Sequence, residues 1–247
     1  MVAEDGNSLG RLAGKKAADL ISHAIDKNGS ANIILATGSS QFATLSELVA
    51  KKDIDWSLVT MFHLDEYLGL SEDHPASFRK YLKERFISRV PIKNYYLING
   101  DASAGDAECE RLNKIIARLE IDVALIGIGE NGHLAFNDPP ADFHTEKPYI
   151  VVALDEACRM QQVGEGWFSS IDDVPHEAIS MSILQILKSK NIICSVPDER
   201  KAVAVKNCIE SEIDNRFPAT ILRSHHACFL YLDPQSASKL SQPIQTA

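Results

Sequence analysis

Residues 123–139 read VALIGIGENGHLAFNDP, and this stretch decides the fold. Its first six residues are almost wholly apolar, which is typical of a short strand buried on both faces of a sheet. Gly127, Gly129 and Gly132 follow within six residues and allow a backbone path that other residue types avoid. In parallel sheets, ligands bind beyond the carboxyl ends of the strands. The turn after this strand, with His133 at its crest, is therefore a candidate functional site.

The rest of the chain alternates between strand-like and helix-like segments. Apolar residues between Leu9 and Ala24 recur at three- and four-residue spacings, which predicts an amphipathic helix that Gly29 can end. We expect strands at residues 31–36, 59–64, 95–98, 123–128, 192–196 and 228–232, and helices at 9–24, 37–48, 78–87, 107–119 and 198–209. This order predicts an α/β fold: a single domain over residues 1–247, with a mostly parallel, Rossmann-like sheet and helices on both faces.

The composition excludes several classes of protein. Of 247 residues, 45% are hydrophobic and 24% charged, which excludes a disordered chain, a collagen-like fibre and a small disulfide-stapled scaffold. No apolar run reaches the roughly 18 residues that span a bilayer. Residues 1–10 also lack the apolar core of a signal peptide, so we expect no membrane partner and a cytoplasmic location.

The charge and the cysteines narrow the partners further. A net charge of −9 argues against nucleic acid binding, which needs Lys and Arg to neutralise phosphates. A negative net charge does not exclude a small anionic ligand, because a few local hydrogen-bond donors can bind one. The five cysteines are scattered and form no Cys-x-x-Cys pair, so we expect buried reduced thiols and no metal site. The sequence leaves the oligomeric state open.

Polar residues follow two other predicted strands. Thr37-Gly38-Ser39-Ser40 comes directly after residues 31–36, where a glycine turn and free N–H groups at a helix start can hold an anion. A turn that merely caps a helix is the commoner explanation of such a tetrapeptide. Asp65 and Glu66 follow residues 59–64, and at least one of them can reach the edge of the sheet. The other can face solvent or cap a helix, and two solvated loop acids remain an alternative.

His133 and Asp138 form the most informative pair. An imidazole beside a carboxylate is the usual proton shuttle near neutral pH. The alternative is a histidine that only hydrogen-bonds the loop backbone. The glycine density and the position directly after a buried strand favour the functional interpretation.

Three motifs carry a resemblance to a known family. LDEY at 64–67, HPASF at 74–78 and GIGENGHLAFNDP at 127–139 resemble the glucosamine-6-phosphate deaminase (isomerase) family. The resemblance extends from the Gly38 loop to Lys201. The 6-phosphogluconolactonases share the fold but typically show Asp-Glu-Arg at the first motif and Gly-Asp-Gly-His-Thr-Ala-Ser at the last. This chain has Tyr67 and an Asn-Gly-His-Leu-Ala-Phe-Asn run instead.

The resemblance implies an activity and the residues that perform it. The family opens the ring of glucosamine 6-phosphate, moves a proton from C2 to C1 and releases ammonia, with no metal or organic cofactor. Asp65 matches the proton-transferring base, and His133 matches the ring-opening acid–base residue. Asp138 matches the carboxylate that orients this histidine, a position that is usually Glu. Asn131 stands where well-studied members carry Asp, so it can hold the histidine by a hydrogen bond but supplies no charge.

The resemblance also implies a phosphate site, with one part missing. Gly38, Ser39 and Ser40 match the loop that holds the sugar phosphate, and Lys201 matches a lysine that adds a charge to it. Without the resemblance, Lys201 would be read as a solvated lysine on a helix face. The family's phosphate-clamping arginine should fall near residues 164–167, where this chain has none, and Arg159 lies too early. The loop after Pro139 also lacks the basic residues of an allosteric anion site.

Two rival functions share the fold. A lactonase would use His133 to activate water and would cleave an ester without releasing ammonia. A non-catalytic sugar-phosphate sensor is disfavoured by the charge of −9 and by the presence of both Asp65 and His133. The leading hypothesis is therefore an enzyme whose partner is a phosphorylated amino sugar, of gluco or galacto configuration.

Overall fold

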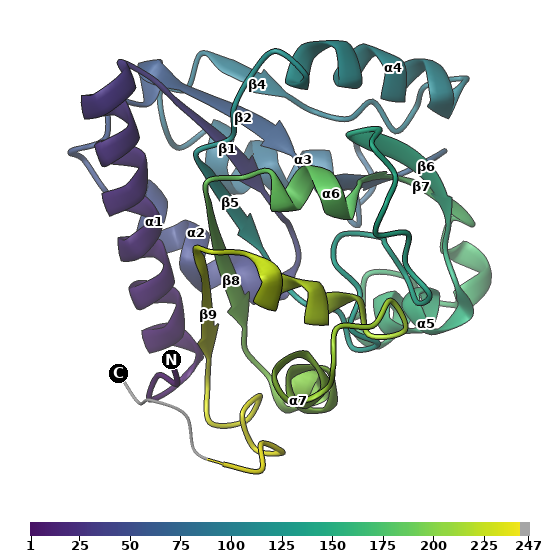
Figure 1. Ribbon diagram of the computed structural model, residues 1–247. Helices are drawn as coiled ribbons and strands as arrows, with labels where there is room; N and C mark the ends of the chain where they lie inside the picture. Colours follow the sequence, from purple (N-terminus) through teal and green to yellow (C-terminus); the bar gives the residue numbers. More distant parts are fainter. Residues whose placement is uncertain (243–247) are drawn as a thin grey trace.

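The computed structural model describes residues 1–242, which form a six-stranded parallel sheet covered by helices (Figure 1). The strand order is β4-β2-β1-β5-β8-β9, and every neighbouring pair in this sheet runs parallel. The strands are β1 (Ala31–Leu35), β2 (Val59–His63), β4 (Asn94–Tyr96), β5 (Val123–Ile126), β8 (Asn191–Val196) and β9 (Cys228–Leu232). Each was expected from its apolar run, to within two residues at either end.

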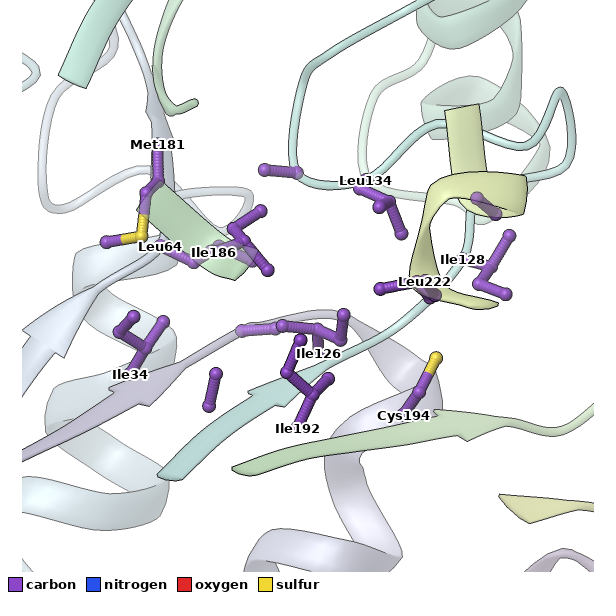
Figure 2. Close-up of a cluster of buried hydrophobic side chains, with 14 of the residues drawn as sticks. Ile34, Leu64, Ile126, Ile128, Leu134, Met181, Ile186, Ile192, Cys194 and Leu222 are labelled. Atoms are coloured by element: carbon purple, nitrogen blue, oxygen red, sulfur yellow. The ribbon is translucent and has the colours of Figure 1, made fainter. Parts of the chain in front are cut away.

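The helices lie on both faces of this sheet, as the alternation predicted. They are α1 (Gly6–Asn28), α2 (Phe42–Val49), α3 (Phe78–Leu82), α4 (Gly105–Ile116), α5 (Glu156–Gly164), α6 (Ile183–Leu187) and α7 (Ala202–Glu210). Alternate residues of one strand enter different cores: Ile33 packs with α1 and α2, and Ile34 packs with α4, α6 and α7. Figure 2 shows part of the second core, where Leu134 and Leu222 lie over Ile126 and Ile192. None of the helices within residues 1–242 is long and apolar enough to cross a membrane.

A second sheet was not anticipated from the sequence. The strands β3 (Asp65–Tyr67), β7 (Glu177–Met181) and β6 (Tyr149–Ala153) pair antiparallel in the order β3-β7-β6. β3 has only three residues, two of them acidic, so its sequence resembles a loop. All three are nevertheless buried, because β3 pairs with β7 from far along the chain. This small sheet holds Asp65 opposite Ser180 and so fixes one candidate site residue.

The strand order reverses between β1 and β5, which lie side by side at the middle of the sheet. Such a reversal leaves a crevice at the carboxyl ends of the two strands, because their following loops turn to opposite sides. The Gly38 loop follows β1 and the glycine-rich loop at 127–133 follows β5. Both loops that the sequence singled out therefore meet at this point.

Candidate active site

A cavity of about 410 Å³ opens at this reversal point. Six of the eight predicted site residues line it: Gly38, Ser39, Ser40, Asp65, His133 and Lys201. Asn131 and Asp138 are not among the lining residues, since they lie behind His133 and contact it from the protein side. The structure thus brings together residues from four separate segments of the chain.

Asp65 faces the cavity with its carboxylate free. Its side chain is only 8% exposed, and within residues 1–242 nothing donates a hydrogen bond to it. Burial, and to a smaller extent the neighbouring Glu66, raises the pKa of the Asp65 carboxyl to about 8. A buried carboxyl without a partner costs stability, which is the pattern of a group kept for chemistry.

Glu66 points the opposite way, as the next residue of a strand must. It is fully buried and accepts hydrogen bonds from the backbone of Phe78 (3.2 Å) and Arg79 (2.8 Å) and from the Ser77 hydroxyl (3.1 Å). The Arg79 guanidinium lies 3.2 Å from the same carboxylate. Glu66 therefore caps α3, one of the alternatives that the sequence left open, and the HPASF motif supplies the capped residues.

His133 lies against a glycine that leaves room for its ring. A Cβ atom on Gly129 would stand 2.2 Å from Nε2 of His133, so only glycine allows the imidazole to occupy this place. The next residue, Leu134, is buried among the core side chains drawn in Figure 2 and anchors the loop there. The position of the ring follows from these two neighbours.

Asp138 contacts the histidine ring despite its short side chain. Its Oδ1 lies 3.0 Å from Nδ1 of His133, although the approach is bent away from the ideal hydrogen-bond direction. Asn131 Nδ2 donates to the same oxygen at 3.0 Å, and the Asp155 N–H donates to Oδ2 at 3.3 Å. Burial on its own would raise the pKa of Asp138, but the contacts with His133 and Asn131 outweigh it and lower that pKa. Asp138 therefore reaches the imidazole although its side chain is one methylene shorter than the glutamate that is usual at this position.

Asn131 holds His133 by a hydrogen bond, as the sequence predicted, and it also holds Asp138. Its Oδ1 accepts the backbone N–H of His133 at 3.0 Å, and its amide holds Asp138 rather than the imidazole. Cys158 completes the group, since its sulfur lies within 4.8 Å of ligand atoms of His133 and Asp138. Burial and the nearby Asp138 raise the pKa of this thiol, which keeps it protonated. The sequence offered no signal for its place there.

The loop after β1 turns at Gly38 and lines the cavity. Gly38 has φ of 94°, a conformation that favours glycine, and its carbonyl accepts a hydrogen bond from Tyr81. Gln41 ties this loop to its neighbours, because its amide donates to the carbonyls of Ile126 (3.3 Å) and Ser195 (3.4 Å). Sequence reasoning missed Gln41, whose buried position only the tertiary structure reveals.

Lys201 is not a solvated lysine on a helix face. It is 5% exposed and lines the cavity, and burial lowers the pKa of its ammonium group. Asp198, with φ of 89°, begins the short turn that carries it. Non-glycine residues with a positive φ of this size have strained backbones, and such residues cluster at functional sites. Lys201 therefore lies in the cavity, and its role toward a phosphate group stays a prediction.

The segment where an arginine was sought supplies an acid instead. Glu165 lines the cavity, with Oε1 3.6 Å from Nζ of Lys201. Arg159 donates to the carbonyls of Ile171 and Val174 and is not among the lining residues. Arg200 does line the cavity, a role that the sequence did not reveal although it is the neighbour of Lys201.

Comparison with known proteins settles the family. The family model for glucosamine-6-phosphate isomerases/6-phosphogluconolactonase matches residues 4–231. The chain belongs to this family. A protein of Lacticaseibacillus paracasei named glucosamine-6-phosphate deaminase is 40% identical over 233 residues, which cover 93% of this chain and 95% of the relative. One of the same name from an Exiguobacterium strain is 35% identical over 99% of this chain and 93% of its own.

Solved structures give the same picture within this family. A monomeric glucosamine-6-phosphate deaminase superposes with a TM-score of 0.88 at 33% identity, covering 96% of this chain and 99% of its own. The 6-phosphogluconolactonase of Trypanosoma brucei superposes with a TM-score of 0.79 at 18% identity, with 98% of each chain covered. The second likeness shows the shared fold alone.

Proposed function

We propose that this protein converts glucosamine 6-phosphate, or a close epimer, into the ketose 6-phosphate and ammonia. One observation carries the proposal: the buried carboxylate of Asp65, which has no hydrogen-bond partner among residues 1–242, faces the same cavity as a histidine backed by a second carboxylate. Relatives at 35–40% identity over most of the chain bear the deaminase name, which supports the same substrate class.

Ring opening is assigned to His133. The ring oxygen must gain a proton and the C1 hydroxyl must lose one, so the group involved has to give and take a proton in turn. Asp138 fixes the imidazole through Nδ1 and leaves the other ring nitrogen, Nε2, for the substrate. Asp138 and Asn131 act through the histidine and its loop, and are positioning residues in this scheme.

Proton transfer from C2 to C1 is assigned to Asp65. With a pKa of about 8, its carboxyl is largely protonated at neutral pH in the free protein. The ammonium group of a bound amino sugar favours the ionised carboxylate, so substrate binding creates the base. Asp65 then takes the C2 proton while one proton of the ammonium group passes to the C1 carbonyl oxygen, which gives an enolamine, and Asp65 returns a proton to C1. The resulting C2 imine adds water and loses ammonia, which leaves the ketose.

The phosphate end is assigned to Gly38, Ser39, Ser40 and Lys201. The positive φ of Gly38 turns the backbone at the cavity, and the serine hydroxyls add donors. Lys201, which lines the same cavity, supplies a charge. These steps use only side chains and backbone groups of this chain.

The test is a product assay on the purified protein. Ammonia and ketose 6-phosphate should form in equal amounts from glucosamine 6-phosphate, and the galacto epimer should be run in parallel to settle the configuration. 6-Phosphogluconolactone should not be hydrolysed faster than it hydrolyses in buffer. Lactone hydrolysis without ammonia release from either amino sugar would overturn the proposal.

A further inference from the structure

Glu165 is held firmly at the phosphate end of the cavity. Gln161 Nε2 donates to its Oε1 at 2.9 Å, and the indole N–H of Trp167 donates to its Oε2 at 3.3 Å. The side chain is only 9% exposed. Its carboxylate therefore has a defined place beside Lys201, on the wall where an arginine was expected.

Both cations of this end already have acidic partners. Lys201 Nζ lies 3.6 Å from Glu165, and both side chains are nearly buried, at 6% and 9% exposed. Arg200 lies 2.8 Å from Asp198 and 3.6 Å from Glu130. A phosphate dianion entering here meets two neutralised cations and at least one carboxylate with which it must compete. A like charge a few ångströms from the phosphate costs more beside side chains as buried as Lys201 and Glu165 than it does in water.

We propose that Glu165 is the specificity-determining residue of this end of the cavity: its carboxylate pairs with Lys201, and a phosphoryl group must displace it to bind. Glu165 thereby sets how strongly the protein prefers a phosphorylated sugar to its unphosphorylated form. The sugar part of this inference rests on the proposed function, whereas the competition for Lys201 can be measured with inorganic phosphate alone.

The first experiment titrates inorganic phosphate into the protein by calorimetry at fixed pH and ionic strength. Glu165→Gln removes the charge but keeps the size and an acceptor oxygen for Gln161 and Trp167. We expect the dissociation constant for phosphate to fall about tenfold. Glu156→Gln is the matched control, since it removes one charge from an exposed site on α5 and should leave phosphate affinity unchanged.

A double-mutant cycle identifies the group through which Glu165 acts. Lys201→Met weakens phosphate binding by itself. In the Lys201→Met background, Glu165→Gln should give a much smaller gain than in the parent, because the contested ammonium is gone. An equal gain in both backgrounds would show that Glu165 acts by long-range charge alone and would overturn the competition for Lys201.

The second experiment compares sugars. The ratio of kcat/KM for glucosamine 6-phosphate to that for glucosamine should rise about tenfold in Glu165→Gln, through KM for the phosphorylated sugar. If the parent deaminates neither sugar, the proposed function fails, yet the phosphate titration still decides the role of Glu165. Unchanged or weaker phosphate affinity in Glu165→Gln would overturn the inference. Should this variant not fold, Glu165→Ala serves in its place, with the same expected direction.

Discussion

The two ends of the cavity differ in how their charges are paired. At the proton-transfer end, Asp65 has no partner within the described residues and His133 keeps one ring nitrogen toward the cavity. At the phosphate end, Lys201 and Arg200 each stand beside a carboxylate. At the first end, Asp65 and His133 are available to a substrate. At the second end, an incoming anion must compete with the carboxylates that already pair with the cations. In the proposed scheme, separate residues set the chemistry and the anion affinity of this site, so that substitutions should change the two properties separately.

Asp65→Asn is the strongest way to break this comparison. Because asparagine cannot carry the proton from C2 to C1, kcat should fall by about 10²- to 10⁴-fold with KM little changed.

Asp65→Asn should lower turnover but raise the stability of the folded protein. The Asp65 carboxyl has a pKa of about 8 in the folded protein, so it keeps its proton at pH values where the unfolded chain has lost it. The contribution of Asp65 to the free energy of unfolding therefore decreases as the pH rises from about 4 to 8.

The same variant should therefore unfold at a higher temperature than the parent near pH 8, and the difference should shrink below pH 5. Steady-state kinetics and thermal melts on one preparation measure both effects. Near-parental turnover would remove Asp65 from the mechanism.

Asp138→Asn tests whether the histidine depends on its carboxylate. We expect a loss of about 10²-fold in kcat/KM, since an amide no longer stabilises the charged imidazole. Asn131→Asp is the comparison variant. It replaces the amide that donates to Asp138 with a second carboxylate 3.0 Å away, so one of the two must take up a proton.

Asn131→Asp should accordingly lose activity at high pH and regain part of it as the pH falls. The sequence alone predicts otherwise: aspartate at position 131 would keep activity and move the acidic limb of the pH–rate profile upward, because it adds a negative charge beside the imidazole. Profiles of kcat/KM against pH for the two variants and the parent give the answer. An Asp138→Asn enzyme with parental activity would mean that another group orients His133.

Lys201→Ala tests the end of the cavity that we assign to the phosphate. Removing the ammonium should raise KM for the phosphorylated sugar by about tenfold or more and leave kcat within a few-fold. The KM for the unphosphorylated sugar should change little. Equal effects on both sugars would show that Lys201 does not contact the phosphate.

Glu66→Gln should have the smallest effect on turnover, although Glu66 adjoins Asp65. Its carboxylate caps α3 and pairs with buried Arg79, so the cost falls on stability, by about 3 kcal/mol in the free energy of unfolding. Loss of the neighbouring charge should also lower the pKa of Asp65 and move the acidic limb of the kcat/KM profile to lower pH. Denaturant unfolding and kinetics below the melting temperature separate the two effects. A loss of kcat as large as that of Asp65→Asn would contradict their division of labour.

The sequence predicted the parallel sheet because its strands are short apolar runs, which are visible in the local sequence. It did not predict the antiparallel sheet, since β3 reads as a polar loop and is a strand only through its pairing with β7. The candidate site divides in the same way. Asp65, His133 and Lys201 stand in short motifs or beside a strand end, whereas Glu165 reaches Lys201 across 36 positions of sequence through the placing of α5. Contacts of this kind have no local signal.

Transfer of a proton through Asp65 is the central claim, and solvent deuterium tests it most directly. The reaction with glucosamine 6-phosphate is run in D₂O, and the ketose product is analysed by NMR for deuterium at C1. Asp65 lines an open cavity, so its proton exchanges with solvent, and the account predicts deuterium at one C1 position in a substantial part of the product. Ketose and ammonia formed with no deuterium at C1 would contradict it, because the hydrogen would then have moved from C2 to C1 without a stop on the carboxylate.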